Sequence, residues 1–591
     1  MFAGNLPLGL LVLTIPTALF SPSHVLSFRR MRRTLPTFIV TDLVPSREGW
    51  GRRFMTMASA EASHRPQKVA VLGAGAAGLV TGRLFHEAGF RVRIFEKTST
   101  VGGVWKYRPE DVVYRSLVTN LPKEIMAFLD TPFDPSLPSF LRHTDVQTYL
   151  EGYAKQYDVE KLITFDTEVK EVRPVRRTRG QEGEGAAPYP PGDYTREHGL
   201  GAAREKGGPE GAGEEGEAPM WRVTVVRQAG GSVAGACEGV PESEVFDAVV
   251  VCNGHYQVPH CPDLPGLREH YRGRVMHSRD YDHPEALRGL KVLCVGYRAS
   301  GTDIAREVAQ VASEVHVVDR RLSKMTEDGK DEAGSLQRGN IYRRPGLRVF
   351  LPGGDGKSAM FEDGSVCTGI DLVLYCTGFQ YHMPFLSGGS AFESRPLSPS
   401  ALLSDARLLR VEDRAVFPLY QHLFHAFFPS LVFIGLLHSV VPFPLFELQA
   451  LWALKTLRQP LGSDPPPPSL PPRRRRFQWL EEEKMRQEAA GRVLGRDWFF
   501  LGPGQWAYKR LLAREAGCLT SALEEDLQVR EGIYNDVSNR RPVFPGGSDA
   551  YRRCEYRRVA GGEGWEVEVG GKGSFEGAGE EKGEGARKAE C

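Results

Sequence analysis

The feature that most constrains the fold is a pattern of strand, glycine turn, helix and strand that begins at Lys68. Residues 68–96 read KVAVLGAGAAGLVTGRLFHEAGFRVRIFE, in which an apolar strand runs into glycines spaced as GxGxxG and a second strand ends on an acid. The first glycine permits a tight turn, the second lets backbone amides approach a pyrophosphate, and the third lets helix and strand pack closely. The pattern therefore predicts a Rossmann-like unit that binds a dinucleotide.

Each residue of this turn has an expected role. The amides at the start of the helix face the pyrophosphate, because a helix N-terminus favours an anion. Glu96, at the end of the second strand, is the residue type that accepts hydrogen bonds from a ribose diol. The candidate residues of the turn itself are Gly73, Ala74, Gly75, Ala76, Ala77 and Gly78.

The same pattern returns at residues 291–321, which read KVLCVGYRASGTDIAREVAQVASEVHVVDRR. Arg298 replaces the middle glycine, and its side chain would narrow the approach of a pyrophosphate at that point. This copy is weaker when taken alone, but it still predicts a second dinucleotide-binding turn. Its candidate residues are Gly296, Tyr297, Arg298, Ala299, Ser300 and Gly301.

The end of this second copy carries two conflicting signals about the nicotinamide cofactor. Arg320, followed by Arg321, stands where a cation neutralises the 2′-phosphate of NADP, whereas Asp319 is the residue type that the ribose of NAD prefers. We give the cations more weight, so we expect NADP(H). Two dinucleotide sites in one chain further indicate a flavin and a nicotinamide, between which electrons pass.

Composition excludes several other classes of function. The chain carries 75 basic and 74 acidic side chains, so it lacks the positive charge of a nucleic-acid-binding protein. Its cysteines form no CxxC pair, and none precedes Cys237, so neither a zinc site nor a disulfide framework is expected. A reducing compartment is therefore the expected environment of the folded part.

Residues 1–65 are predicted to be a cleavable targeting leader. The first 41 residues contain no Asp or Glu, and an apolar run is followed by a basic stretch, which suits delivery to a plastid or another organelle. The alternative is translation from Met55 or Met57, which would give a cytoplasmic chain. The sequence does not decide between these two.

Three further segments are predicted to be unstructured because they contain few apolar residues to bury. Residues 176–219 are rich in Gly and Glu and interrupt two expected strands, 168–175 and 221–226. Residues 463–476 are expected to form a Pro-rich and basic loop, and residues 546–591 a disordered Gly/Glu tail.

Several motifs in the chain resemble those of flavin-containing monooxygenases. YRGRVMHSRDY at 271–281 is similar to the family fingerprint FxGxxxHxxxY, and SLVTN places Asn120 on the family's active-site asparagine. GGVW, with Gly103 and Trp105, resembles the family's flavin-side motif, and YCTGFQYHMPF from Tyr375 resembles its CTGY strand. The likeness extends from about residue 68 to 545 and is greatest to the plant-type S-oxygenating, glucosinolate S-oxygenase-like branch.

The resemblance implies an α/β fold with two Rossmann-like dinucleotide-binding domains, in which the NADPH domain is inserted into a discontinuous FAD domain. We expect the FAD domain at 66–285 and 370–545 and the NADPH domain at 288–369. We also expect no stable membrane anchor in the mature chain, because the apolar stretch 431–454 is interrupted by His, Pro and Glu.

The resemblance also implies a reaction. NADPH reduces FAD, molecular oxygen adds to the flavin C4a carbon, and the hydroperoxide transfers one oxygen atom to a soft S or N nucleophile of a small molecule. Asn120 would form a hydrogen bond near the flavin, and neither a metal nor a catalytic triad is required. His277 is interpreted as a hinge residue without a role in proton transfer.

Three alternatives stand beside this interpretation. Baeyer–Villiger monooxygenases have a similar fingerprint but end it in Trp where this chain has Tyr281. Thiol-disulfide flavoreductases need a redox cysteine pair soon after the first turn, and the sequence has none there. A nucleotide-binding redox sensor without turnover would share both turns, and only reduction by NADPH distinguishes it.

Overall fold

A computed structural model of the chain describes twelve stretches of residues between 67 and 569. They are 67–109, 111–175, 219–228, 239–320, 322, 337–386, 409–412, 414–458, 470–493, 495–541, 549–559 and 564–569. All of them belong to one compact unit, 50–591. The predicted leader, and the predicted insert apart from Pro219, lie outside these residues, so both stay predictions.

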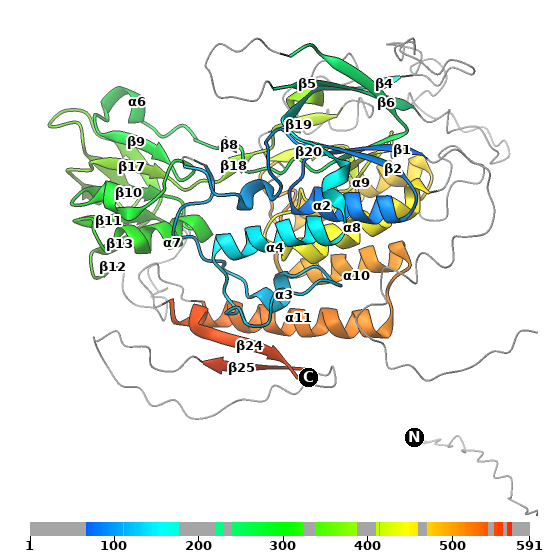
Figure 1. Cartoon of the computed structure of the whole chain (residues 1–591). Coiled ribbons are helices and arrows are strands. Elements are labelled where there is room, and N and C mark those ends of the chain that lie inside the picture. Colours follow the sequence, from blue (N-terminus) through cyan, green and yellow to red (C-terminus); the bar gives the residue numbers. More distant parts are fainter. Residues whose placement is uncertain are drawn as a thin grey trace, which may run out of the picture. The chain divides into compact units, whose positions relative to one another are not determined.

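The first sheet has seven strands in the order β21-β22-β23-β7-β1-β2-β3 (Figure 1). Its centre is parallel and is crossed over by helix α2, Ala76–Glu87. Every residue of β7 is buried, as expected for a parallel strand covered on both faces. The strands are β1 (Lys68–Leu72), β2 (Arg91–Phe95), β3 (Ile163–Thr164), β7 (Ala248–Val251), β21 (Leu419–Tyr420), β22 (Phe424–His425) and β23 (Leu431–Phe433).

The second sheet has six strands in the order β12-β13-β11-β10-β17-β9. It is parallel except at β12, and its crossover helix is α7, Ala299–Val308. The strands are β9 (Arg274–His277), β10 (Lys291–Val295), β11 (Glu314–Val318), β12 (Gln337–Arg338), β13 (Ile341–Arg344) and β17 (Leu372–Tyr375).

The two motif strands, β1 and β10, therefore lie in different sheets, which confirms the prediction of two Rossmann-like units. The predicted range of the inserted unit, 288–369, is too narrow. β17 pairs with β10 and β9 pairs with β17, so residues on both sides of that range complete the second sheet. The buried LVLY run of β17 needs neighbouring strands on both sides to satisfy its backbone, and β10 and β9 supply them. The remaining domain limits stay predictions.

The two strands predicted around the insert are confirmed. They form a three-stranded antiparallel sheet as β4 (Thr167–Val175), β5 (Met220–Arg227) and β6 (Glu242–Phe246). Smaller antiparallel groups are β8 (Val258–Pro259) with β18 (Phe379–Gln380), β19 (Arg410–Glu412) with β20 (Ala415–Phe417), and β14 (Leu347–Phe350), β15 (Ala359–Phe361) and β16 (Val366–Cys367).

Helices pack against the first sheet, and further helices from the later part of the chain pack against these (Figure 1). The apolar stretch 431–454 becomes strand β23 and most of the buried helix α8. Within the described stretches, no helix is long and apolar enough to cross a bilayer. The remaining helices are α3 (Lys123–Met126), α4 (His143–Gln156), α6 (Leu267–His270), α8 (Pro442–Leu457), α9 (Arg473–Ala489), α10 (Gln505–Ala516) and α11 (Ser521–Arg540).

Two segments predicted to be unstructured are partly folded. The four arginines at 473–476 form the first turn of α9, and the buried Arg476 donates from Nε to the carbonyl of Ala426 at 2.9 Å. That prediction is therefore wrong for 473–476, because Arg476 has a carbonyl partner that allows its burial. Residues 459–469 lie outside the described part of the chain.

The carboxy-terminal segment contains a hairpin of β24 (Cys554–Arg558) and β25 (Trp565–Val569), preceded by a short 3₁₀ helix, Asp549–Arg553. The prediction of a disordered tail from 546 is therefore wrong for 549–559 and 564–569. CEYRR and WEVEV alternate in the manner of half-buried strands, and Tyr556 is buried. Residues 570–591 lie outside the described part.

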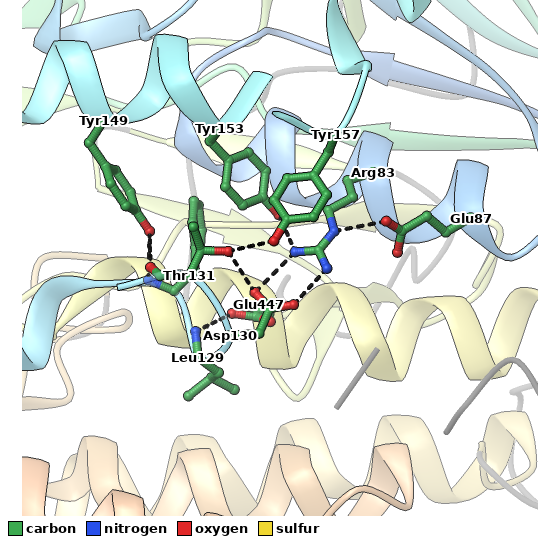
Figure 2. Close-up of polar contacts among 10 residues, drawn as sticks. Arg83, Glu87, Leu129, Asp130, Thr131, Tyr149, Tyr153, Tyr157 and Glu447 are labelled. Atoms are coloured by element: carbon green, nitrogen blue, oxygen red, sulfur yellow. Dashed lines mark hydrogen bonds and ion pairs between the residues drawn. The ribbon is translucent and has the colours of Figure 1, made fainter. Parts of the chain in front are cut away.

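A buried polar cluster joins helices α2, α4 and α8 (Figure 2). The guanidinium of Arg83 donates to Asp130 through Nη1 at 3.0 Å and Nη2 at 2.6 Å, and to the hydroxyl of Tyr153 at 3.1 Å. Glu447 of α8 enters the same cluster and accepts a hydrogen bond from the amide of Leu129 at 2.6 Å. Burial and, to a lesser extent, the charge of Asp130 raise the pKa of Glu447 to about 8.

Replacing Glu447 with Gln should therefore flatten the pH dependence of stability. A native pKa above the unfolded value makes stability fall as pH rises from about 4.5 to about 8, by up to ~1.4 kcal/mol per pH unit. Glu447→Gln mimics the protonated carboxyl, so the variant should gain stability over the parent at pH 8 but not at pH 5. Denaturant midpoints at both values test this, with the exposed Glu481→Gln as control. Parallel pH profiles for Glu447→Gln and the parent would contradict it.

Candidate active site and cofactor sites

Packing within the protein explains two of the three glycines of the first turn. A Cβ on Gly73 would lie 2.7 Å from the carbonyl oxygen of Cys252, and one on Gly78 would lie 1.9 Å from that of Gly73. A Cβ on Gly75 would meet only Gly103, at 3.6 Å from its Cα, which is an ordinary contact. The protein itself therefore does not require glycine at 75, in agreement with the prediction that a diphosphate lies against the start of α2.

Gly75→Ala should consequently fold but bind FAD poorly. The added methyl has room in the protein, whereas overpacking against a bound diphosphate costs about 1 to 3 kcal/mol, or roughly tenfold to hundredfold in affinity. The ratio of flavin to protein absorbance after purification, together with thermal unfolding of the apoprotein, measures both properties. A Gly75→Ala protein that stays fully occupied by flavin at nanomolar protein concentration, with the same flavin affinity as the parent, would show that Gly75 does not face the diphosphate.

The carboxylate of Glu96, directly after β2, connects the first turn to the residues that follow β2. Its Oε2 accepts from the amide of Ala74 at 2.8 Å, and its Oε1 accepts from the amide and the hydroxyl of Thr98 at 2.9 and 2.8 Å. A carboxylate offers about four acceptor sites, so these bonds leave capacity for a ribose hydroxyl. The structure therefore shows a fixed, ionisable acceptor at the predicted place, and the ribose contact stays a prediction.

The GGVW loop lies directly against the first turn. The amide of Gly102 donates to the carbonyl of Ala74 at 3.0 Å, and a Cβ on Gly103 would lie 3.0 Å from the Cα of Gly75. Gly103 has φ +57°, a backbone conformation that glycine adopts without strain. Trp105 follows in the same 3₁₀ turn. The two predicted flavin-binding segments are therefore brought together.

The second turn repeats the geometry of the first. A Cβ on Gly296 would lie 2.5 Å from the carbonyl oxygen of Cys376, and one on Gly301 would lie 2.1 Å from that of Gly296. The side chain of Arg298 extends away from this turn toward Phe500. Its guanidinium carbon lies 5.7 Å from the centroid of the Phe500 ring. The guanidinium carbon of Arg343 lies 5.2 Å from the ring centroid of Tyr297. Arg298, Ala299 and Ser300 are exposed at the start of α7.

The structure separates the two conflicting nicotinamide signals. Asp319 is only 2% exposed, and its Oδ2 pairs with Nη2 of the buried Arg343 at 2.9 Å. Its carboxylate is thus committed to an internal ion pair. Arg320, one residue later, is exposed. The residue that favours NAD is buried, and the one that favours the 2′-phosphate of NADP faces solvent.

Arg320→Ala should raise the Michaelis constant for NADPH much more than that for NADH. A charge-assisted contact with a phosphate is typically worth about 1.5 to 3 kcal/mol, and NADH has no phosphate at this position to lose. Steady-state kinetics with both nicotinamides measure the difference. Equal losses for the two cofactors would assign the preference to another cation.

Asn120 lies in a loop whose backbone is held and whose side-chain amide is not. Thr119 donates its amide to the carbonyl of Leu141 at 2.8 Å, and its hydroxyl accepts from the amide of Leu141 at 2.9 Å. The carbonyl of Asn120 accepts from Nη2 of Arg541 at 2.5 Å. Across the described stretches, no hydrogen bond to the Asn120 side chain is found. A turn-forming asparagine would bond its own backbone, so this arrangement favours contact with a ligand.

His277 of the fingerprint motif has a structural role. Its Nδ1 accepts from the amide of Arg279 at 3.0 Å, so Nε2 carries the proton and donates to the carbonyl of Gly378 at 3.0 Å. Burial lowers the pKa of His277, which keeps the ring neutral. The bond ties the end of β9 to the turn after β17, in agreement with its interpretation as a hinge residue. Tyr281 donates to Glu307 of α7 at 2.6 Å.

Sequence patterns missed the two arginines that contact the Asn120 loop. Arg541 and Arg552 donate to the carbonyls of Asn120 and Thr119, although they lie 421 and 433 residues away. The available signal was the strand-like alternation of 554–558, which indicates that this segment is folded. No local pattern indicates which carbonyl a distant arginine reaches.

Two Rossmann-like turns, one of them in contact with a flavin-side loop, define a flavoprotein that uses a nicotinamide. Comparison with known proteins narrows this class. The family described as "Flavin-binding monooxygenase-like" matches residues 66–182 and 226–333. "Flavin-containing monooxygenase FMO GS-OX-like 4" of Arabidopsis thaliana is 31% identical over 508 residues, which cover 81% of this chain and 93% of that protein.

Solved structures agree with this relationship. The S-allyl-L-cysteine S-oxygenase from Allium sativum has a TM-score of 0.60 and 30% identity, with 83% of this chain and 96% of that chain covered. Tmm from Pelagibacter has a TM-score of 0.56 at 21% identity, which shows the fold alone. The chain therefore belongs to the flavin-containing monooxygenase family. Its cofactors are FAD and NADPH, and it transfers oxygen from molecular oxygen to a small molecule.

Proposed function

We propose that the enzyme oxygenates the sulfur of small thioethers. The observation that carries this proposal is the 30% identity to an S-allyl-L-cysteine S-oxygenase over 83% of the chain. Relatives named FMO GS-OX-like, among them one 33% identical over 413 residues, support the same branch. A tertiary amine is the competing substrate class, because the family's chemistry reaches both soft S and soft N nucleophiles.

Residues of the chain bind and orient the cofactors in this reaction. The start of α2 with Gly75 would hold the FAD diphosphate, and the start of α7 with Arg320 would hold NADPH. FAD supplies the activation of oxygen once NADPH has reduced it. Asn120 would donate its amide N–H toward the reacting centre, where exclusion of water strengthens each hydrogen bond.

Neutral side chains near the turn after β7 fit a substrate that needs no deprotonation. His255, whose ring contacts Tyr381, and His438 of the carboxy-terminal half have pKa values of about 4, because burial disfavours their charged forms. Each ring is therefore uncharged at neutral pH and is a weak base, poorly suited to take a proton from a substrate. A thioether has no proton to lose, whereas an alkyl tertiary amine is protonated at neutral pH and must first lose its proton.

The test compares the two substrate classes directly. Purified enzyme is given NADPH with either S-allyl-L-cysteine or N,N-dimethylaniline, and the products are identified by mass spectrometry. We expect the sulfoxide as the main product, with a larger kcat/KM for the thioether. N-oxide formation with the larger kcat/KM would assign the enzyme to the amine-oxygenating class instead.

A further inference from the structure

The loop that carries Asn120 is held by two arginines from the last part of the chain. Arg541 donates from Nη2 to the carbonyl of Asn120 at 2.5 Å, and Arg552 donates from Nε to the carbonyl of Thr119 at 3.2 Å. Consecutive carbonyls are thus fixed by separate guanidinium groups. Both arginines lie beyond the part of the chain that matches the flavin-binding monooxygenase-like family, which ends at residue 333.

Tyr551 holds these two arginines in place. Its ring centroid lies 5.5 Å from the guanidinium carbon of Arg541 and 5.3 Å from that of Arg552. The ring is 5% exposed and makes an edge contact with Phe140, with centroids 5.5 Å apart. A buried aromatic ring next to both cations restricts their rotamers, so the two donors are kept in position before any ligand binds.

The segment that contains Arg552 is docked firmly on the first Rossmann-like unit. The amide of Tyr556 donates to Oγ of Ser139 at 2.8 Å, and the amide of Ser139 donates to Oε2 of Glu555 at 3.0 Å. The hydroxyl of Tyr556 also donates to Asp536 of α11 at 2.8 Å. Figure 1 shows β24 beside α11 accordingly. Arg552 thus extends from a fixed support.

Arg552 also reaches the second Rossmann-like unit. Its Nη2 pairs with Oδ2 of Asp303 at 2.7 Å, and the two side chains are 12% and 17% exposed. Asp303 lies in α7, two residues after Gly301 closes the nucleotide-binding turn. One guanidinium therefore contacts the helix at which NADPH binds and the carbonyl next to Asn120. Its planar fork can serve both partners, whereas a lysine ammonium is a single point.

We propose that Arg541 and Arg552 are positioning residues for Asn120, and that the Arg552–Asp303 pair links the position of Asn120 to nicotinamide binding at α7. NADPH at the start of α7 fixes this helix, the ion pair fixes Arg552, and Arg552 fixes the Thr119 carbonyl. The inference rests on the monooxygenase class and is independent of the substrate proposed above.

The test uses hydrogen exchange at the Thr119 amide and peroxide release without substrate, in full-length enzyme loaded with FAD. Arg552→Ala should speed exchange at Thr119 by about tenfold and raise peroxide formed per minute by a similar factor, since a charged hydrogen bond is lost. Arg552→Lys should rescue little, because it cannot span both partners. Arg553→Ala, an exposed neighbour, is the control and should match the parent.

A second variant keeps the test decisive if Arg552→Ala does not fold. Asp303→Asn leaves the Thr119 contact of Arg552 in place but removes the carboxylate charge that pairs with Arg552 and, within α7, with Arg306. In the parent, NADP⁺ should slow exchange at Thr119 severalfold, and Asp303→Asn should abolish that effect while still binding NADP⁺. Equal NADP⁺ protection in the parent and Asp303→Asn would overturn the proposed link. Parental exchange and peroxide release in Arg552→Ala would overturn the positioning role.

Discussion

The Gly78→Ala variant should be recovered without bound flavin and with a lower melting temperature. The added Cβ would lie 1.9 Å from the carbonyl oxygen of Gly73, which is backbone and cannot rotate away. Helix α2 must therefore move off β1, and overpacking of this kind costs about 1 to 3 kcal/mol or more. Displacement of the helix also removes the amides that face the diphosphate. Flavin absorbance per protein and thermal unfolding are the measurements.

Gly152→Ala is the matched control for this variant. Gly152 lies in helix α4, and a Cβ there would meet nothing within 4 Å. Alanine is favoured over glycine inside a helix by about 0.5 to 1 kcal/mol, so this variant should keep its flavin and gain a little stability. A Gly78→Ala protein with full flavin content and the parental melting temperature would refute the geometry assigned to the first turn.

Asn120→Ala should retain FAD and its reduction by NADPH but lose most oxygen transfer to substrate. The nucleotide-binding turns are untouched, so NADPH and oxygen should still be consumed, with hydrogen peroxide replacing oxygenated product. Loss of one hydrogen bond in a site without water is worth about 1 to 3 kcal/mol, or roughly tenfold to hundredfold in the lifetime of the reactive species. Peroxide formed per NADPH, with and without a thioether, measures the shift.

Asn120→Asp adds a sharper comparison, because it keeps the shape of the side chain and removes the N–H donor. It should uncouple as strongly as the alanine variant if donation from the amide is what matters. Coupling equal to that of the parent in both variants would reduce Asn120 to a residue of the loop backbone.

Local chemistry explains which parts of the site could be predicted from sequence. Gly78 is dictated by its contact with Gly73 inside the same turn, so the GxGxxG pattern contains the reason for it. Gly73 has left-handed φ of +106° within the motif, but the atom that its Cβ would meet belongs to Cys252, far along the chain. The buried state of Asp319 depends instead on Arg343, which comes from another strand 24 residues later. The sequence therefore presented Asp319 and Arg320 as conflicting signals, of which the cations received more weight, and only the structure shows that Arg320 alone is exposed.

Long-range contacts explain what sequence patterns missed. The Gly/Glu composition near the carboxyl terminus indicated disorder, yet residues 549–559 fold because Tyr551 and Tyr556 are buried against the first Rossmann-like unit. Likewise, the arginine run at 473–476 looks solvated until Arg476 finds the carbonyl of Ala426. In both cases the partner lies far along the chain, beyond any local pattern.

Oxygen labelling tests the central claim most directly. The purified holoenzyme is given NADPH, S-allyl-L-cysteine and ¹⁸O₂ in unlabelled water. The mass of the product is measured by mass spectrometry, and the consumption of NADPH is followed by absorbance. FAD- and NADPH-dependent oxygen transfer predicts a sulfoxide that carries one ¹⁸O atom, with close to one product formed per NADPH. Labelled peroxide as the sole oxygen product, or no consumption of NADPH by the yellow protein, would contradict it.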